Sequence, residues 1–246
     1  MRFSGKTIAV TGGGSGIGEA IVRRLAGEGA RVAVLDIDEA NATRVAGEAD
    51  RARAFRVDVT DAAALAEAFT QVVSEFGGLH GAVNNAGVGG PFVASANYPL
   101  EWWDRIVAIN LSGVFYSLRA QLPHLVAQGG GAIVNMASIC GFIGQAGTAG
   151  YVATKHAIIG LTKTIALEYG AQGIRCNAVC PTYVRTPLTL AELNDPEVWQ
   201  QLDARHATGR CATPEDVAAM TVFLLSEEAR SVTGSAHLVD GGITAC

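Results

Sequence analysis

Short runs of apolar, often β-branched residues alternate along the chain with longer segments in which apolar residues recur every three to four positions. The short runs predict seven strands, at 6–12, 30–36, 52–59, 79–85, 131–138, 174–181 and 236–242. The longer segments predict helices at 17–28, 62–76, 103–128, 151–170 and 214–226. Apolar strands joined through helices indicate a parallel sheet that is covered on both faces.

This pattern predicts a single α/β domain over residues 1–246, with a doubly wound, parallel seven-stranded sheet flanked by helices. No linker, repeat or change of composition divides the chain. One stretch, 187–210, fits none of the strand–helix units. Because it is polar and has helical spacing, we expect it to form a mobile helical flap over the substrate.

The first predicted strand runs directly into a glycine-rich turn, Thr-Gly-Gly-Gly-Ser-Gly-Ile-Gly at 11–18, and a predicted helix follows it. Glycines let the backbone approach a pyrophosphate, and the start of a helix supplies unpaired N–H groups and a positive dipole end. Such a string alone is also typical of a flexible turn, but here it lies in the first βαβ unit. We predict a dinucleotide site with contacts from Gly12, Gly14, Ser15, Gly16, Ile17 and Gly18.

Asp36 favours NAD over NADP. It ends the second predicted strand, eighteen residues after the glycine turn, where a carboxylate accepts hydrogen bonds from the adenosine ribose. The same charge repels a 2′-phosphate, and neither Ile37 nor Ser15 supplies a basic group for that phosphate. The alternative role is a capping Asp at a strand end. Asp58 and Val59, at the end of the third strand, are predicted to lie near the adenine.

Tyr151 and Lys155 stand four residues apart on one face of a predicted helix. A phenol is a poor acid or base near neutrality, since its ordinary pKa is about 10. A nearby ammonium favours the phenolate, so the pair suits proton transfer to or from a carbinol oxygen. Ser138 follows the fifth strand and can hold the same oxygen. A Tyr–Lys pair alone is usually a surface feature, so this prediction depends on the glycine turn as well.

With these motifs in this order, the sequence resembles the short-chain dehydrogenase/reductase (SDR) family over essentially its whole length. The shared motifs are TGGGSGIG at 11–18, Asp58, NNAG at 84–87, Asn110, Ser138, YxxxK at 151–155 and Pro-x-x-Val-x-Thr at 181–186. The resemblance implies a single-domain Rossmann fold. It also implies an NAD(H)-dependent oxidoreductase that interconverts a secondary alcohol and a ketone, with an apolar or cyclic small molecule as the substrate.

The resemblance implies a role for each matched residue. Tyr151 is expected to be the general acid in reduction and the general base in oxidation, while Ser138 polarises the carbonyl. Lys155 is expected to bind the nicotinamide ribose, and Asn110 to hold a water that links Lys155 to solvent. The remaining implied cofactor contacts are Asn85, Ala86, Gly87, Pro181, Val184 and Thr186. The family commonly has Gly after this proline, and Thr182 departs from that pattern.

The substrate pocket is expected to form from 89–92, 139–145 and the flap, with a largely apolar lining. The predicted substrate contacts are Phe92, Ser138, Gln145, Tyr183 and Trp199. His206 is interpreted as a solvent-exposed helix residue rather than a polar group of the pocket.

Charge and composition exclude several other classes of protein. The net charge of −5 is spread along the chain, so no basic patch indicates nucleic acid. No apolar run is long enough to span a membrane and no signal peptide is evident, which predicts a cytoplasmic protein without a membrane partner. Five cysteines without a CxxC pair predict buried, reduced thiols and no metal site; they are Cys140, Cys176, Cys180, Cys211 and Cys246.

Small residues at Ala153, Ala157, Gly160 and Thr164 form a second stripe on the helix that carries Tyr151. They permit close helix packing, and the resemblance implies that such helices pair across a two-fold axis in a homotetramer. Packing within one chain is the alternative.

Two other functions remain open. A 3-oxoacyl-carrier-protein reductase is disfavoured because that role usually goes with NADP and a basic docking surface. A non-catalytic NAD-binding regulator is disfavoured because it has no need of the complete set of Asn110, Ser138, Tyr151 and Lys155.

Overall fold

Seven strands form one parallel sheet in the order β3-β2-β1-β4-β5-β6-β7. The computed structural model describes residues 1–245, apart from the side chain of Glu192, so Cys246 lies outside the described residues. The strands are β1 (Thr7–Thr11), β2 (Arg31–Asp36), β3 (Ala52–Arg56), β4 (Gly81–Asn84), β5 (Gly131–Met136), β6 (Ile174–Pro181) and β7 (Ala236–Val239). All seven predicted strands, and the predicted fold class, are confirmed.

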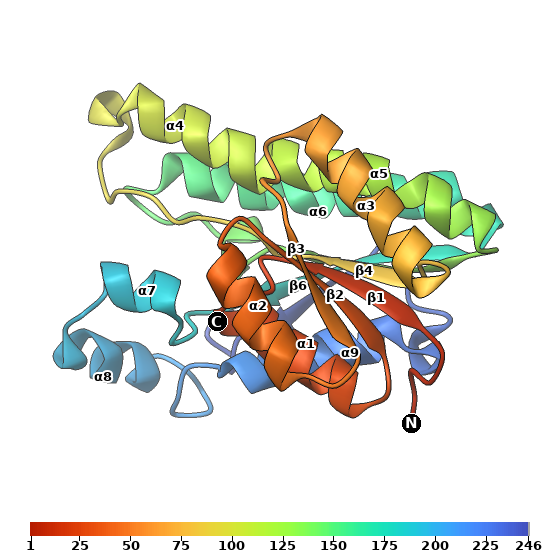
Figure 1. Cartoon of the computed structure of the whole chain (residues 1–246). Helices are drawn as coiled ribbons and strands as arrows, with labels where there is room; N and C mark the ends of the chain where they lie inside the picture. The colour runs from red at the N-terminus through yellow and green to blue at the C-terminus, as the bar shows by residue number, and fades with distance from the viewer. Residues whose placement is uncertain (246) are drawn as a thin grey trace.

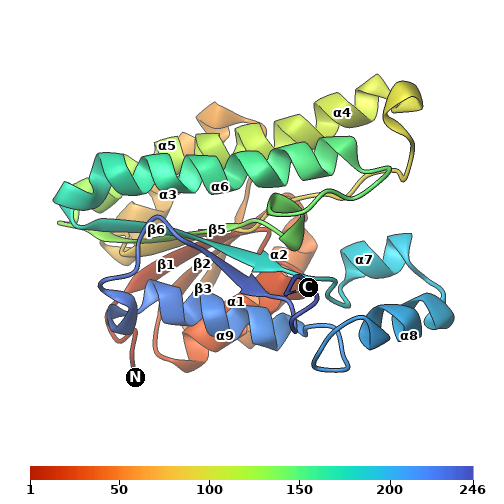
Figure 2. The ribbon, with the colours of Figure 1, turned by 180° about the vertical axis from the view of Figure 1, so that it is seen from behind.

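Helices cover both faces of the sheet (Figures 1 and 2). They are α1 (Gly16–Gly27), α2 (Glu39–Glu48), α3 (Ala62–Phe76), α4 (Leu100–Val107), α5 (Gly113–Ala127), α6 (Ala149–Tyr169), α7 (Pro187–Glu192), α8 (Pro196–Ala204) and α9 (Pro214–Leu225). A π-helical turn (Ala108–Ser112) joins α4 to α5. Single 3-10 turns lie at Ser95–Asn97, Ile139–Gly141, Gly170–Gln172 and Glu227–Ala229.

Two apolar layers hold the helices on the sheet. On one face α1, α2 and α9 pack against the strands, and the α1 side chains Ile21, Val22 and Leu25 are fully buried there. On the other face α3, α5 and α6 enclose a second core. Burying one such side chain contributes roughly 1.5–3 kcal/mol, so the apolar stripes that predict the helices also hold them in place.

The strand order reverses direction beside β1, and this places the site. From β1 the chain builds outward through β2 and β3, then returns to pair β4 on the other side of β1. Ligands of open α/β sheets bind at such a switch point, beyond the carboxyl ends of the strands. The segments that follow β1, β4, β5 and β6 all meet at that edge.

The flap, residues 187–210, projects beyond the carboxyl ends of the strands as α7 and α8 (Figure 1). Helix α7 begins with a capping box in which the Thr186 and Thr189 side chains bond each other's backbone N–H. The predicted helical character of the flap is confirmed, while its mobility stays a prediction. Among the described residues, no helix combines the length and the apolar character that crossing a membrane requires.

Candidate active site

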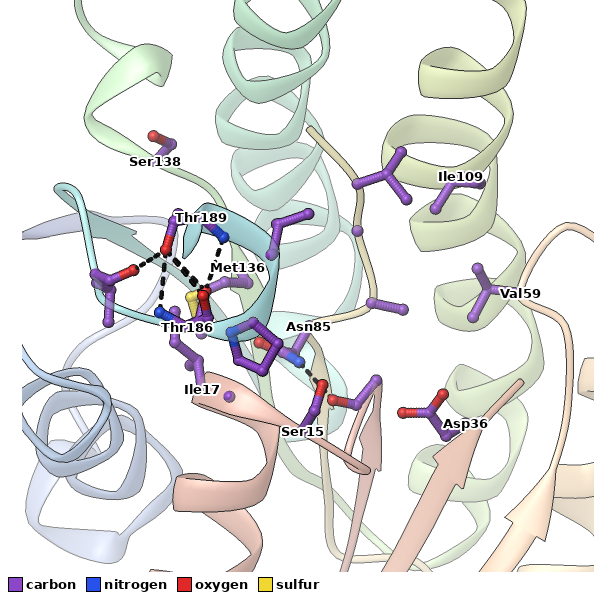
Figure 3. Close-up of a pocket in the computed structure, with 18 of the residues that line it drawn as sticks. Ser15, Ile17, Asp36, Val59, Asn85, Ile109, Met136, Ser138, Thr186 and Thr189 are labelled. Carbon is purple, nitrogen blue, oxygen red and sulfur yellow. Dashed lines mark hydrogen bonds between the residues drawn. The ribbon is translucent and has the colours of Figure 1, made fainter. Parts of the chain in front are cut away.

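A cavity of about 380 Å³ opens at the carboxyl edge of the sheet and extends from Asp36 at one end to Ser138 at the other (Figure 3). Most of the predicted cofactor residues line it: Gly12, Ser15, Gly16, Ile17, Asp36, Ile37, Asp58, Val59, Asn85, Ala86, Gly87, Tyr151, Lys155, Pro181, Val184 and Thr186. The fold therefore brings together residues that are far apart in the sequence.

Two predicted cofactor contacts, Gly14 and Gly18, do not line the cavity and instead let the turn pack closely. A Cβ at Gly18 would lie 1.9 Å from the Gly12 carbonyl oxygen, and one at Gly14 would lie 2.9 Å from Asp36 Oδ2. The turn then delivers the start of α1, which the Ser15 side chain does not cap. Its first N–H groups are therefore available to an anion, as a bound pyrophosphate requires.

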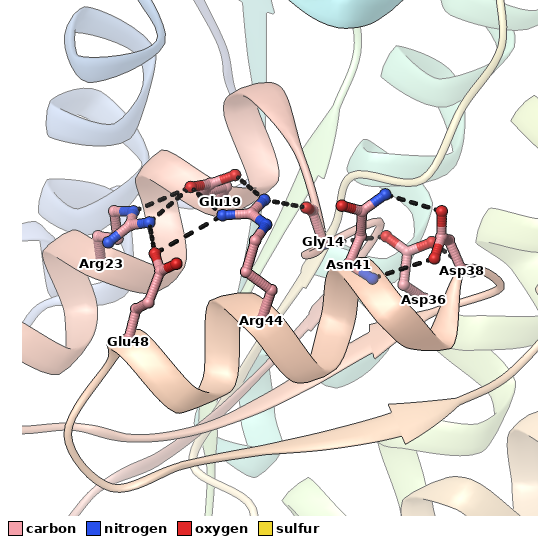
Figure 4. Close-up of polar contacts among 8 residues, drawn as sticks. All are labelled: Gly14, Glu19, Arg23, Asp36, Asp38, Asn41, Arg44 and Glu48. Atoms are coloured by element: carbon pink, nitrogen blue, oxygen red, sulfur yellow. Dashed lines mark hydrogen bonds and ion pairs between the residues drawn. The ribbon is translucent and has the colours of Figure 1, made fainter.

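Asp36 closes the far end of the cavity. Its Oδ2 accepts from the Gly14 N–H at 2.9 Å and its Oδ1 from the Asp38 N–H at 3.0 Å (Figure 4). Carboxylates so held keep a fixed orientation, and Ile37 beside it is 60% exposed and adds no positive charge. A carboxylate in this position would accept hydrogen bonds from a ribose and repel a 2′-phosphate.

A basic side chain that sequence reasoning missed lies next to this end. Arg44 donates to the Gly14 carbonyl oxygen at 3.1 Å and to Glu19 Oε2 at 2.7 Å (Figure 4). The hydrogen bond to Arg44 is the largest of the effects that lower the Glu19 pKa below its usual range. Arg23 and Glu48 complete the cluster. Because Glu19 neutralises Arg44, the guanidinium is not a free phosphate ligand, and no sequence signal links positions twenty-five residues apart.

At the opposite end, Lys155 is held under Tyr151. Its ammonium donates to the Met136 carbonyl oxygen at 2.9 Å and lies 5.4 Å from the centre of the Tyr151 ring. The Lys155 side chain is buried, and burial lowers its pKa to about 8. Tyr151 and Lys155 both begin α6, one turn apart, and Ser138 reaches the same place from the end of β5.

Asn110 is buried away from the cavity. Its Oδ1 accepts from the Val88 N–H at 2.8 Å, and its Nδ2 donates to the Val88 carbonyl oxygen at 2.9 Å. The side chain thus fixes Val88, which lines the cavity. Each end of the amide keeps one further hydrogen-bonding position, and the role of Asn110 in holding a water for Lys155 stays a prediction. The π-helical turn around Asn110 is a feature often found near functional sites.

A second cavity of about 100 Å³ adjoins the first and is lined by four predicted substrate residues, Phe92, Ser138, Gln145 and Tyr183. Gln145 Nε2 donates to Tyr183 Oη at 2.8 Å, and the Cys140 thiol donates to Gln145 Oε1 at 3.1 Å. Five residues line both cavities and are here called the junction: Ser138, Tyr151, Thr182, Leu188 and Thr189.

Two expectations about the flap need correction. Trp199, predicted to touch the substrate, lines neither cavity: its indole is buried, donates to the Leu193 carbonyl oxygen at 2.8 Å and packs under Arg185. It belongs to the small core of the flap itself. The interpretation of His206 as solvent-exposed is wrong, because its ring is 3% exposed and bonds Thr182. A polar helix pattern does not reveal a single side chain turned inward.

Several lining residues were not predicted. Apolar ones come from strand ends and helix faces, where the pattern marks them only as core: Leu35, Val57, Ile109 and Met136. Thr189 is different, since its hydroxyl donates to the Val184 carbonyl oxygen and so shapes the wall of the junction. Its spacing of three from Thr186 before a helix was a signal that could have indicated it.

Four cysteines, Cys140, Cys176, Cys180 and Cys211, are buried free thiols, as predicted. Burial raises the pKa of both Cys176 and Cys180 to about 12, which keeps them protonated and unreactive. Within residues 1–245, no cluster of three or more His, Cys, Asp or Glu is arranged to hold a metal ion.

The fold and the site together define an α/β enzyme with a dinucleotide cavity that leads to a Ser–Tyr–Lys group. The family model described as enoyl-(acyl carrier protein) reductase matches residues 12–244. Cyclohexanol dehydrogenase of Acinetobacter sp. (strain SE19) is 42% identical over 99% of this chain and 96% of its own. The chain belongs to the short-chain dehydrogenase/reductase family, as its motifs predict.

Two solved structures are similar over nearly their whole length. The NADH complex of 3-ketoacyl-(acyl-carrier-protein) reductase from Brucella melitensis is 35% identical, with a TM-score of 0.93 over 98% of this chain and 99% of that one. NAD⁺-bound xylitol dehydrogenase is 32% identical, with a TM-score of 0.95 over 98% of this chain and 100% of that one.

Proposed function

We propose that the protein is an NAD(H)-dependent dehydrogenase that interconverts a secondary alcohol and a ketone on a small apolar or cyclic molecule. The observation that carries this proposal is the junction. A dinucleotide-sized cavity and a smaller, largely apolar cavity meet there, and Ser138 and Tyr151 are among the groups that line both. A hydride donor and a carbonyl would therefore meet beside a phenol and a hydroxyl.

When bound, NAD would supply the hydride acceptor, and the protein supplies the proton chemistry. Tyr151 accepts the hydroxyl proton of the alcohol in oxidation and returns it to the carbonyl oxygen in reduction. Ser138 donates to that oxygen and stabilises its charge. Lys155 would bind the nicotinamide ribose, and its ammonium favours the phenolate of Tyr151. A water held at Asn110 would link Lys155 to solvent as a proton relay.

The smaller cavity favours substrates that carry a second oxygen. Burial raises the pKa of Tyr183, so its hydroxyl keeps its proton. Because Gln145 donates to Tyr183 Oη, the Tyr183 proton can point to an acceptor on the substrate. Phe92 and Leu188 supply apolar walls for a ring. Cyclohexanol dehydrogenase, a relative at 42% identity, acts on a compact cyclic alcohol by its name.

A 3-oxoacyl-carrier-protein reductase remains the second candidate. The Brucella relative with that activity is complexed with NADH, so a preference for NAD does not separate the two functions. The size of the smaller cavity, about 100 Å³, favours a compact substrate over a carrier-bound chain.

The deciding experiment measures turnover by reduced-nicotinamide absorbance with NAD or NADP. The panel holds cyclic, aliphatic and aryl secondary alcohols, and acetoacetyl thioesters for the reverse direction. We expect NAD-linked turnover of a cyclic alcohol. Turnover of acetoacetyl thioesters alone would support the second candidate, and NADH binding without any turnover would support a regulator.

Tyr151→Phe is the matched variant because it removes only the phenolic oxygen. We expect turnover to fall by about a thousandfold while NADH affinity, followed by fluorescence, is nearly unchanged. A variant that turns over normally, or one that loses NADH binding instead, would show that Tyr151 has been given the wrong role.

We also propose that the protein is a cytoplasmic homotetramer. The small residues on α6 support this: Ala153 and Gly160 are exposed, and a Cβ at Gly160 would meet no atom within 4 Å. Leu167 continues the same stripe and is 86% exposed. Phe115, on neighbouring α5, is 47% exposed. The buried free thiols support a reducing compartment.

A further inference from the structure

Thr182 and His206 form a buried hydrogen bond directly behind the junction. Thr182 Oγ1 lies 2.8 Å from His206 Nε2, and the two residues are 8% and 3% exposed. Thr182 follows β6 and lines both cavities, while His206 comes from the flap, just after α8. The pair therefore links the flap to the point where the two ligands would meet.

The second nitrogen of His206 fixes the tautomer of its ring. Nδ1 lies 2.7 Å from the Leu202 carbonyl oxygen, which can only accept, so Nδ1 carries the proton. In the neutral ring Nε2 then has only a lone pair, and the Thr182 hydroxyl must donate to it. With its single proton engaged by His206, Thr182 Oγ1 can only accept a further hydrogen bond, and Thr182 lines both cavities.

We propose that Thr182 is a specificity residue of the junction that accepts a hydrogen bond from an N–H or O–H of the bound ligands, and that His206 is the positioning residue that makes Thr182 an acceptor. The inference rests on the proposed function for the identity of those ligands. Two groups can supply the donor: the carboxamide NH2 of nicotinamide, or a second hydroxyl on the substrate.

Because the pair is buried, the Thr182 hydroxyl proton stays directed at His206 Nε2. If Thr182 turned its proton into a cavity, His206 Nε2 would be left without a partner inside the protein, and an unsatisfied buried polar atom is costly. A glycine at position 182, which the family commonly has, would offer the ligand no acceptor and would leave His206 Nε2 unsatisfied. The threonine and the histidine therefore make sense only as a pair.

The experiment compares two ratios in wild type, Thr182→Val and Thr182→Ser. The first is the affinity for NAD against that for its 3-acetylpyridine analogue, which lacks the amide N–H, measured by calorimetry without substrate. The second is kcat/KM for cyclohexane-1,2-diol against cyclohexanol. We expect Thr182→Val to lower at least one of these ratios by about fivefold, which is the effect of losing one neutral hydrogen bond. Thr182→Ser keeps the hydroxyl, so we expect it to keep the wild-type ratios.

The two ratios assign the donor. A change only in the first identifies the carboxamide, and a change only in the second identifies a substrate hydroxyl. If Thr182→Val leaves both ratios as in wild type, the proposal is overturned. If the wild type binds NAD and turns over alcohols, but Thr182→Val has the same two ratios as the wild type, only this inference is refuted. If the wild type neither binds NAD nor turns over alcohols, the proposed function is refuted.

Two further variants separate recognition from folding. The double variant Thr182→Val with His206→Phe removes both partners of the hydrogen bond, so no buried Nε2 is left unsatisfied. It is the variant to use if Thr182→Val alone does not fold. In this double variant we expect the same ratio to fall as in Thr182→Val, and by a similar factor. Thr221→Val is the matched control, because Thr221 is also buried but bonds Val217 within α9, far from both cavities. Both ratios should stay as in wild type, with only thermal stability reduced.

Discussion

At the scale of single residues, the burial of Lys155 is unfavourable for folding and useful for chemistry. Its ammonium has one carbonyl partner, and burial lowers its pKa to about 8 from an ordinary 10.5. The folded protein therefore binds this proton less tightly than the unfolded chain. Below pH 8 both states are charged and the folded state bears the full penalty, which is relieved as the pH rises from 8 to 10.5.

Lys155→Met should for this reason stabilise the protein at pH 7, by at most about 3 kcal/mol, while abolishing activity. The advantage over wild type should shrink by pH 9.5, since wild type gains stability across that window and the variant has no group to titrate there. Denaturant unfolding of both proteins at the two pH values measures it. An advantage that is equal at both pH values would contradict the stated cause.

Asp36 and Ile37 determine the second prediction at this scale. Asp36→Ala with Ile37→Arg removes the carboxylate that opposes a 2′-phosphate and adds a cation beside it. The ratio of kcat/KM for NADP over NAD should rise by at least about a hundredfold. Asp58→Ala is the comparison variant, measured in the same way. Asp58 lines the same cavity but is predicted to lie near the adenine rather than the ribose, so the ratio should not rise. An unchanged ratio would remove Asp36 from the ribose site.

At the scale of elements, apolar periodicity predicts most of what is observed. The five inner strands follow from it because strands buried on both faces read as continuous apolar runs, while the edge strands β3 and β7 are only partly buried. Helix α2 was missed, since only Ala42 and Val45 of its ten residues are buried and its stripe is too narrow to read. The π-helical turn at Asn110 was missed as well, because one extra residue in a turn leaves no periodic signal.

The candidate site divides in the same way. The glycine turn, Asp36 and Ser138 were predicted from their place after strands, whereas the contacts at 85–87 and 181–186 were predicted from the family resemblance. Side chains that depend on tertiary contacts were not: Arg44 is neutralised by a helix neighbour, and Trp199 turns into the flap core. Such contacts join residues whose spacing along the chain carries no regular pattern.

The packing of α1 on the glycine turn gives an element-scale prediction. Gly18→Ala would place a Cβ 1.9 Å from backbone, so the helix must move away from the turn. We expect NADH affinity to fall by more than about tenfold and the melting temperature to drop. Gly27→Ala is the matched control at the exposed end of the same helix, where a Cβ meets nothing within 4 Å. It should leave affinity unchanged and raise stability slightly.

At the scale of the whole molecule, the exposed face of α6 lies on the side of the sheet opposite α1 and α9 (Figure 2). It presents small residues and an apolar side chain to solvent, and no element within residues 1–245 covers them. Tyr151 and Lys155 lie near the start of the same helix, so pairing of this face would stiffen the support of Tyr151.

Leu167→Glu tests the assembly. A charge at this position would be desolvated in a subunit interface, so light scattering should show a smaller species than wild type. Gln200→Glu, at an exposed position of α8, adds the same single negative charge away from α6 and controls for the change in net charge. A wild type that is already monomeric would refute the homotetramer while leaving the proposed activity intact.

The junction between the two cavities has a kinetic consequence. The smaller cavity opens into the larger one, so a nicotinamide bound beside Ser138 and Tyr151 would form the wall that the smaller cavity lacks. An alcohol arriving first would find an incomplete pocket, while a cofactor arriving first finds its own site complete. Turnover should therefore follow a compulsory order, with cofactor first to bind and last to leave.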